Sequence, residues 1–236
     1  MGALDGQVAV VTGGTRGVGR AIAEAYVAAG ATVVVNGRDR ESGEAFASGS
    51  ERFSFYPGDV SEKVTVEGLL DQTAQERGRI DVVVLNAGGS NGDEPVASMS
   101  DNDWQRALDL NLNHVFWGMR RALNHMLPRK SGRIVVTSAI EGKLPRPGAS
   151  AYVAAKHAVN GLVKSVAREV GTEGIAVNAI LPGPIDAATE HLEALSKLGR
   201  RNTAEEVARV AVLLASPSIT SITGCLFPVD GGTMPY

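Results

Sequence analysis

The stretch Gln7-Val-Ala-Val-Val-Thr-Gly-Gly-Thr-Arg-Gly-Val-Gly19 decides the fold class of this 236-residue chain. Its first five residues form an apolar run rich in β-branched side chains, which is typical of a strand buried on both faces. A glycine-rich turn follows and leads into an apolar helical pattern that ends at Gly30. This order predicts a phosphate site, because glycines let backbone N–H groups approach a pyrophosphate at a helix N-terminus. A tight loop without a ligand is the alternative.

The same alternation of apolar runs and helical patterns continues along the chain. Helical patterns cover residues 62–77 and 101–126, and Thr203 opens a capping box with Glu206. Alternation at this period predicts an α/β protein with a single-domain Rossmann fold, a doubly wound parallel sheet of about seven strands with helices on both faces. Without a linker, repeat or low-complexity block, we expect one domain over residues 1–236. The further strands are expected at Thr32–Asn36, Arg52–Tyr56, Ile80–Leu85, Arg133–Thr137, Ile175–Ile180 and Leu226–Val229.

Composition argues against several classes of protein. The 23 basic and 26 acidic residues are dispersed and give a net charge of −3, which favours neither nucleic acid nor an anionic membrane as a partner. Cys225 is the only cysteine, so no intrachain disulfide can form. The first residues lack a signal-peptide pattern, and no apolar run reaches ~18 residues. The four histidines have no metal-ligand spacing, so we expect a cytoplasmic protein without a metal site.

Residues after the second predicted strand set the choice of dinucleotide. An acidic side chain at Asn36, Gly37 or Arg38 would accept a hydrogen bond from the ribose 2′-hydroxyl of NAD and repel the extra phosphate of NADP, but none is present. Arg38 and Arg16 could instead clamp a 2′-phosphate. We therefore expect NADP(H) rather than NAD(H), with ordinary surface charges as the alternative reading of both arginines.

Two further segments end predicted strands at the same edge of the sheet. Asp59 could accept a hydrogen bond from an adenine amino group, or it could cap the next helix. Asn86-Ala-Gly88 follows the fourth strand, and open α/β sheets bind ligands at this edge. The small residues leave room for a flat cofactor, and Asn86 can tie adjacent turns together.

Tyr152 and Lys156 are the candidate chemical groups. Residues four apart share one face of a helix, so the phenol and the ammonium project into the same space. A cation beside a phenol favours the phenolate, and we expect Lys156 to lower the pKa of Tyr152 towards the range in which it exchanges a proton with an alcohol or ketone. Asn111 lies within the long helical pattern, where it is either exposed or marks an irregularity that frees a carbonyl to hold a water near Lys156.

Together these motifs resemble the short-chain dehydrogenase/reductase family over essentially the whole chain, and most of all its branch of 3-oxoacyl-[acyl-carrier-protein] reductases and ketone reductases. The resemblance implies an NADP(H)-dependent oxidoreductase that interconverts a ketone and a secondary alcohol. A small-molecule or acyl-thioester carbonyl substrate and a homo-oligomer, tetramer or dimer, are expected with it. The motifs are Thr12-Gly13-x3-Gly17-x-Gly19, Asp59, Asn86-Ala-Gly88, Asn111, Tyr152-x3-Lys156, Asn178 and Pro182-Gly183.

The resemblance also assigns roles to individual residues. Tyr152 would be the acid/base, Lys156 would lower its pKa and hold the nicotinamide ribose, and Asn111 would support a water in a proton relay. Residues 186–202 would form a flap over the substrate. The cofactor is expected along Gly13, Thr15, Arg16, Gly17, Val18, Gly19, Arg38, Asp59, Val60, Asn86, Ala87, Gly88, Tyr152, Lys156, Pro182, Gly183 and Ile185.

The chain departs from the family pattern at the substrate. The family places a serine 13 residues before the tyrosine to hydrogen-bond the substrate oxygen, and here that position is Ala139. Ser138 is the nearest hydroxyl, but adjacent side chains of an extended segment point to opposite faces. Losing one such donor costs about 10²–10³ in rate. Three explanations fit: a deliberate Ser-to-Ala substitution, a natural variant of low activity, or Ser138 acting through an unusual backbone.

A second departure is Ala187, which stands where the family has a threonine that contacts the cofactor, with Thr189 as a possible replacement. These two departures leave a second functional hypothesis beside the reductase. The chain would then be a nucleotide-binding protein that kept the fold and has little or no catalytic activity. The sequence does not identify the substrate, because a widely reused fold does not specify one.

Overall fold

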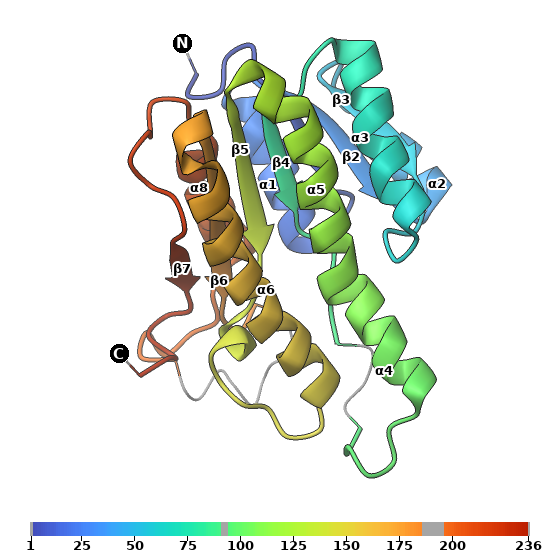
Figure 1. The fold of residues 1–236 in the computed structure, drawn as a ribbon, viewed down its shortest axis with the longest axis vertical. Helices are drawn as coiled ribbons and strands as arrows, with labels where there is room; N and C mark the ends of the chain where they lie inside the picture. Colours follow the sequence, from blue (N-terminus) through green and yellow to red (C-terminus); the bar gives the residue numbers. More distant parts are fainter. Residues whose placement is uncertain (1, 91–93, 186–195, 236) are drawn as a thin grey trace.

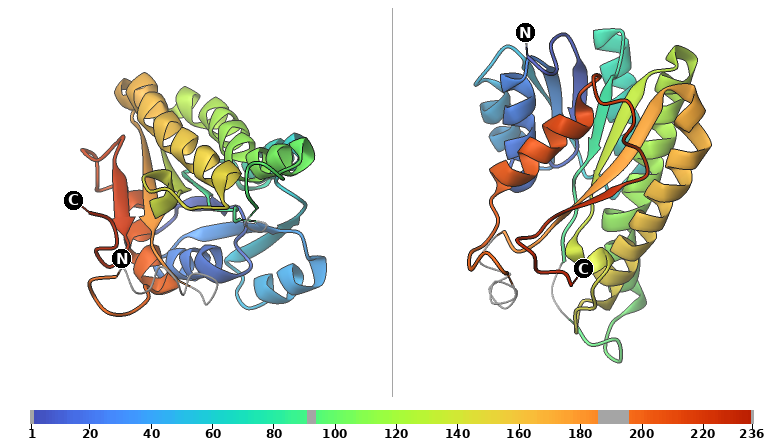
Figure 2. Two further views of the ribbon diagram at one scale, coloured as in Figure 1. Left: turned by 90° about the horizontal axis from the view of Figure 1, so that it is seen from below. Right: turned by 90° about the vertical axis from the view of Figure 1, so that its left-hand side faces the viewer.

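The computed structural model describes residues 2–90, 94–185 and 196–235. Its centre is a seven-stranded parallel sheet in the order β3-β2-β1-β4-β5-β6-β7, with helices on both faces (Figures 1 and 2). The predicted α/β Rossmann fold is confirmed. The strands are β1 (Val8–Val11), β2 (Thr32–Gly37), β3 (Phe53–Pro57), β4 (Val82–Leu85), β5 (Gly132–Thr137), β6 (Ile175–Pro182) and β7 (Leu226–Val229).

Two helical layers bury the sheet. Helices α1 (Gly17–Ala28), α2 (Arg40–Ala47) and α8 (Ala204–Ala215) cover one face (Figure 2). Helices α3 (Lys63–Arg77), α5 (His114–Met126) and α6 (Ser150–Val170) cover the other, and each face has its own apolar core. Strands β1, β4 and β6 are fully buried between these layers, which explains their unbroken apolar runs. The remaining elements are α4 (Asp101–Leu108), the π-helix η1 (Asp109–Asn113) and the 3-10 turns η2 (Leu127–Arg129), η3 (Ile140–Gly142) and η4 (Gly171–Glu173).

The strand order brings the glycine turn and the Asn86 segment together. Strand β1 pairs with β2 on one side and with β4 on the other, so the chain reverses its direction of travel across the sheet at β1. Ligands of open α/β sheets bind at the carboxyl ends of the strands at such a switch point. The loops after β1 and β4 lie next to each other here.

The predicted helix over 101–126 is interrupted. Its middle is the π-helical segment η1, which contains Asn111, with α4 before it and α5 after it. Asn111 is fully buried, so the exposed reading was wrong and the predicted irregularity is confirmed. Its Nδ2 donates to the carbonyl of Ala107 at 3.0 Å, which competes with regular helix hydrogen bonds.

The capping box predicted near the C-terminus is confirmed. Thr203 and Glu206 form the predicted capping box at the start of α8.

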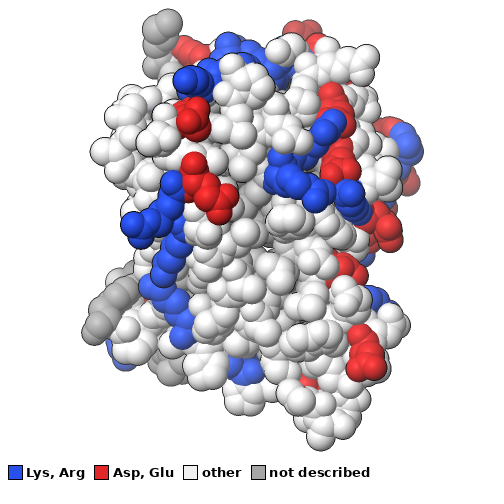
Figure 3. Space-filling view, viewed as in Figure 1, with Lys and Arg blue, Asp and Glu red and all other residues white. Residues whose placement is uncertain are grey.

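On the face shown in Figure 3, acidic and basic side chains are interspersed rather than gathered by sign. Within the described ranges, no helix has the length and apolar character needed to cross a membrane.

Candidate active site

The turns after β1 and β4 are locked to each other by Thr12 and Asn86. Thr12 Oγ1 accepts hydrogen bonds from the backbone N–H groups of Asn86 (2.9 Å) and Ala87 (3.1 Å). Asn86 Nδ2 donates back to the carbonyls of Thr12 (3.1 Å) and Gly13 (3.4 Å). These four bonds hold the floor of the site rigid between two strands.

The glycines of the first turn form a cradle that side chains would fill. A Cβ on Gly19 would lie 2.2 Å from the carbonyl oxygen of Gly13, and one on Gly13 would lie 3.1 Å from Ala87 Cα. Gly17 has a φ of +54° with open space where a Cβ would stand, at the first turn of α1. Arg16 precedes this helix without a side-chain cap bond. Free N–H groups and a positive helix end facing open space fit a pyrophosphate.

At the far end of this cradle, Arg38 follows β2 and lies 3.8 Å from the Asp59 carboxylate; the arginine is exposed and the aspartate half-buried. The nearest acidic residue to Arg38 along the chain, Asp39, is already engaged, because its carboxylate accepts from Ser42 N at 2.6 Å and caps α2. Asn36 is buried and donates to backbone carbonyls of the neighbouring β3 segment. Arg38 is therefore the cation at the end of β2, with the Asp59 carboxylate beside it.

Asp59 does not cap helix α3, so that alternative was wrong. The N-cap of α3 is Glu62, without a side-chain bond. Asp59 Oδ1 instead accepts from Ser61 N at 2.9 Å, two residues on, and its other oxygen faces Arg38. Val60 is buried beside it. The adenine reading of Asp59 stays a prediction.

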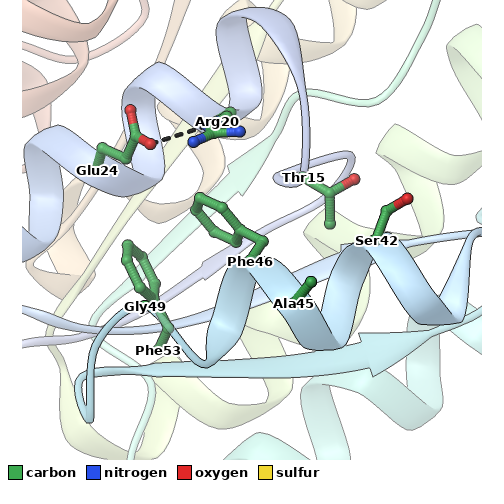
Figure 4. A pocket seen from close by; sticks show the side chains of 8 residues that line it. All are labelled: Thr15, Arg20, Glu24, Ser42, Ala45, Phe46, Gly49 and Phe53. Atoms are coloured by element: carbon green, nitrogen blue, oxygen red, sulfur yellow. Dashed lines mark hydrogen bonds and ion pairs between the residues drawn. The ribbon is translucent and has the colours of Figure 1, made fainter.

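A groove between α1 and α2 adjoins this end of the site (Figure 4). Thr15 of the glycine turn lies at its inner end, and Phe46 and Phe53 supply aromatic walls. Arg20 in the groove is held by Glu24 at 2.8 Å, and its guanidinium carbon lies 5.1 Å from the Phe46 ring centroid. Arg16 and Arg38, rather than Arg20, thus remain the candidates for a phosphate.

The opposite end of the cradle brings Asn111, Lys156 and Gly88 together. A Cβ on Gly88 would lie 2.8 Å from Asn111 Oδ1 and 3.2 Å from Lys156 Nζ. Asn111 is pinned to Gly89, with Oδ1 accepting from its N–H (2.9 Å) and Nδ2 donating to its carbonyl (3.0 Å). Lys156 is buried, and its Nζ donates to the Thr137 carbonyl at 3.0 Å. Burial lowers the pKa of Lys156 to about 8, while the Glu141 carboxylate opposes that shift.

Tyr152 lies one helical turn before Lys156, whose Nζ is 5.5 Å from the phenol ring centroid. Burial of the phenol raises the pKa of Tyr152, Glu141 raises it further, and Arg146 lowers it. The net shift is upward, so the expected direction of the Tyr152 pKa shift was wrong. Desolvation of the phenolate outweighs the opposing effect of Arg146, since burial disfavours the charged form. The expected contribution of Lys156 stays a prediction.

Ser138 is buried beside Gly142. A Cβ on Gly142 would meet Ser138 Oγ at 3.1 Å, the backbone carbonyl oxygen of Lys156 at 3.0 Å and Asn160 Nδ2 at 2.4 Å, so the hydroxyl lies near the stretch of α6 from Lys156 to Asn160. Ser138 Oγ has no hydrogen-bond partner among the described residues. Ala139 is buried at the position that the family pattern gives to serine.

The last predicted cofactor residues, Pro182, Gly183 and Ile185, follow at the end of β6. Gly183 N donates to the Val229 carbonyl at 2.9 Å, and a Cβ on Gly183 would lie 2.7 Å from Asp230 Cα. This turn is therefore packed against β7. Of the predicted flap 186–202, residues 186–195 lie outside the described residues, and Ala187 and Thr189 with them.

A family model for short chain dehydrogenases matches residues 7–197. The chain belongs to the short-chain dehydrogenase family. This short-chain dehydrogenase is 39% identical over 249 residues to a 3-oxoacyl-[acyl-carrier-protein] reductase of Synechocystis, covering all of both chains. It is 36% identical over 270 residues to a 3beta-hydroxysteroid dehydrogenase of Mediterraneibacter gnavus, covering 100% of this chain and 98% of the relative. It is an oxidoreductase of this family.

Sequence reasoning missed several residues of this short-chain dehydrogenase site. Thr12 lies in the quoted motif, but its bonds to the β4 turn depend on strand order. Thr137 contributes a backbone carbonyl, which no side-chain pattern reveals. Glu141 and Arg146 lie in a Gly- and Pro-rich loop, where charged side chains usually face solvent. The one sequence signal for a role in the site is that this loop directly precedes Tyr152. Among the residues that the structure describes, no group of three or more His, Cys, Asp or Glu side chains could hold a metal ion.

Proposed function

We propose that this short-chain dehydrogenase is an NADP(H)-dependent oxidoreductase that interconverts a ketone and a secondary alcohol. The observation that carries the proposal is the cluster at one end of the glycine cradle. There Lys156 Nζ lies 5.5 Å from the Tyr152 ring, and Asn111 and Gly88 close the same space. The names of its relatives support a 3-oxoacyl thioester or a hydroxysteroid as the substrate class.

The residues that would hold the cofactor follow the edge of the sheet. The N–H groups of the turn from Gly13 to Gly19 would bind the pyrophosphate, and Arg16 and Arg38 would bind a 2′-phosphate. Asp59 and Val60 would border the adenine, and Asn86 to Gly88 would border the nicotinamide half. When bound, a nicotinamide cofactor supplies the hydride to the carbonyl carbon or takes it from the alcohol.

Tyr152 would supply the proton in the reducing direction. Because burial raises its pKa, the phenol is protonated at neutral pH and can donate to the carbonyl oxygen as that oxygen gains negative charge. Lys156, with a pKa of about 8, is mostly cationic at pH 7 and stabilises the phenolate that proton donation leaves behind. Ala139 offers no hydrogen bond to the substrate oxygen, so Tyr152 has to orient that oxygen alone. We therefore expect a slow enzyme.

Ala139 also favours a second candidate function, a nucleotide-binding protein with little or no turnover. Two measurements together distinguish the hypotheses. The first is NADPH oxidation with a 3-oxoacyl thioester, a 3-ketosteroid and small ketones, and the second is calorimetric titration of NADPH binding. Turnover that disappears in Tyr152→Phe while NADPH binding is kept supports the reductase. Binding without turnover on any carbonyl supports the second candidate.

We further propose a homo-oligomer. Helix α4 exposes Trp104, α5 exposes Phe116 and η2 exposes Leu127, and Phe116 keeps 44% of its surface accessible. Figure 3 shows a broad area with few charges near α4 and the start of α6. Exposed aromatic and aliphatic side chains on such a surface are typical of subunit interfaces. Light scattering on the purified protein, with Phe116→Asp as the disruptive variant, tests the assembly.

A further inference from the structure

The loop before Tyr152 contains an ion pair that the proposed chemistry does not use. Arg146 Nη1 donates to Glu141 Oε1 at 3.1 Å, and the two side chains are only 12% and 9% exposed. Within residues 2–90, 94–185 and 196–235, it is the ion pair in which both side chains are this deeply buried. Burying two charges costs about as much free energy as their attraction returns, so stability alone is a poor reason for the pair.

The pair lies against the phenol ring. The guanidinium carbon of Arg146 is 5.4 Å from the Tyr152 ring centroid, within the range of a cation–π contact. Lys156 Nζ is at a similar distance, 5.5 Å, so two cations contact one ring. Arg146 reaches the ring from the loop, whereas Lys156 reaches it from α6 itself.

Among the residues that the structure describes, four titratable groups lie around Tyr152 and Lys156. Glu141 comes from η3, Arg146 from the following loop and Lys156 from α6, and buried His114 of α5 lies close enough to Lys156 to be affected by its charge. Glu141 raises the pKa of both Tyr152 and Lys156, and Arg146 lowers that of Tyr152. Burial is the largest cause of the Tyr152 shift, and the pair adds two opposing charges to it from outside helix α6.

We propose that Arg146, held in place by Glu141, is a positioning residue for Tyr152 and fixes the phenol in the orientation of a proton donor where position 139 has no hydroxyl. This inference rests on the proposed function of Tyr152 as the proton donor. A serine at position 139 would orient the reacting oxygen from the β5 side, and here the fixed cation steadies the ring instead. A small misplacement of a reacting group can lower a rate by about 10²-fold.

Four variants test the proposal: Arg146→Met, Arg146→Lys, Glu141→Gln and the double variant Arg146→Met/Glu141→Gln. The double variant removes both charges together, so no unpaired buried carboxylate is left to unfold the protein. A surface pair of the same kind, Arg40 with Glu44 at 3.0 Å, provides the controls Arg40→Met and Glu44→Gln. In the reductase assay we expect Arg146→Met and the double variant to lower kcat about tenfold or more with KM nearly unchanged, and Arg146→Lys to restore part of kcat.

A second readout does not depend on turnover. The chain has four tyrosines, so selective labelling gives a simple NMR spectrum in which the Tyr152 signal is identified by its loss in Tyr152→Phe. We expect the Tyr152 ring signal to shift or broaden in Arg146→Met and in the double variant, while the buried Tyr26 signal stays in place and reports an intact fold. The surface controls should change neither signal.

The two readouts separate failure of the inference from failure of the proposed function. If the wild-type protein reduces no carbonyl, the proposed function fails, and the ring signal alone decides whether Arg146 positions Tyr152. A Tyr152 signal that is the same in wild type, Arg146→Met and the double variant overturns the inference. A kcat of the double variant within about twofold of an active wild type also overturns the inference. The expected loss is about tenfold, which corresponds to about 1.4 kcal/mol.

Discussion

Lys156 Nζ donates a 3.0 Å hydrogen bond to the backbone carbonyl of Thr137, the last residue of β5. This bond ties the middle of the site to the carboxyl end of a central strand, so the ammonium has a fixed position before any ligand binds. It also explains why a buried lysine is tolerated, since a buried charge needs hydrogen-bond partners. The remaining N–H groups of Lys156 are directed by this anchor towards the space beside Tyr152 and Gly88.

Restoring the missing hydroxyl should accelerate the enzyme. We expect Ala139→Ser to raise kcat for carbonyl reduction by about 100-fold, because one preorganised donor to a developing oxyanion contributes about that much. Steady-state NADPH oxidation measures the change. Ser138→Ala is the matched control and should leave kcat unchanged, because adjacent side chains of an extended segment point to opposite faces and the Ser138 hydroxyl lies beside Gly142. The opposite result, no gain from Ala139→Ser and a loss from Ser138→Ala, would make Ser138 the donor.

Arg38 should decide the preference between the two dinucleotides. We expect Arg38→Ala to weaken NADPH binding by about tenfold or more, the size of one charge-assisted hydrogen bond, and to leave NADH binding unchanged. Calorimetric titration of both cofactors gives the ratio. Arg40→Ala removes a nearby exposed arginine that pairs with Glu44 and should change neither affinity. An unaltered NADPH/NADH ratio in Arg38→Ala would leave no basis for choosing NADP(H).

His114 should make the protein sensitive to acid. Burial lowers its pKa to about 3, with the Lys156 charge adding to the shift, although the Leu110 carbonyl opposes it. The unfolded chain takes up this proton near pH 6.5 and the folded chain does not, so the stabilisation is complete above pH 6.5 and is lost as the pH falls towards 3. From pH 7 to 4.5 this group alone should cost about 3 kcal/mol.

Urea unfolding at the two pH values checks this expectation in wild type and in His114→Gln, which should lose much less stability on acidification. His157 is the matched control. It makes the same bond to the carbonyl four residues earlier, but it is exposed on α6. If His157→Gln protects against acid as well as His114→Gln does, buried His114 is not the cause.

The capping box of α8 should contribute measurably to stability. Thr203 Oγ1 accepts from Glu206 N at 3.3 Å, and Glu206 Oε2 accepts from Thr203 N at 2.8 Å. We expect Thr203→Ala to lower the free energy of unfolding by about 1 kcal/mol. Glu62 occupies the same position of α3 without a side-chain bond, so Glu62→Ala should have a smaller effect. Equal losses in the two variants would show that the box adds nothing.

The periodicity of the sequence predicted most of the fold. Strands buried on both faces carry unbroken apolar runs, which is why their positions could be predicted, whereas the register of β1 with β2 and β4 is seen only in the structure. The capping box and the break near Asn111 were also predictable, because both depend on residues close together in the chain. Strand ends were off by one or two residues, as at β4, where the predicted Ile80 and Asp81 precede the strand.

The candidate site was only partly predictable. Spacing placed Tyr152 and Lys156 on one helical face, and their proximity follows from helix geometry alone. The direction of the Tyr152 pKa shift did not follow, because it depends on how much water the surrounding segments remove. The burial of the Glu141–Arg146 pair could not be predicted from the sequence either, since a charge in a loop usually faces solvent.

By itself, the sequence determined the order of strands and helices, the glycine cradle and the spacing of the phenol and the ammonium, since all three are properties of neighbouring residues. Only the tertiary structure decided that the carbonyl of Thr137 fixes Lys156, that Ser138 is buried beside Gly142 and that a buried arginine contacts Tyr152. Those contacts join segments brought together by packing. Their energies depend on distance and burial, which exist only once the chain is folded.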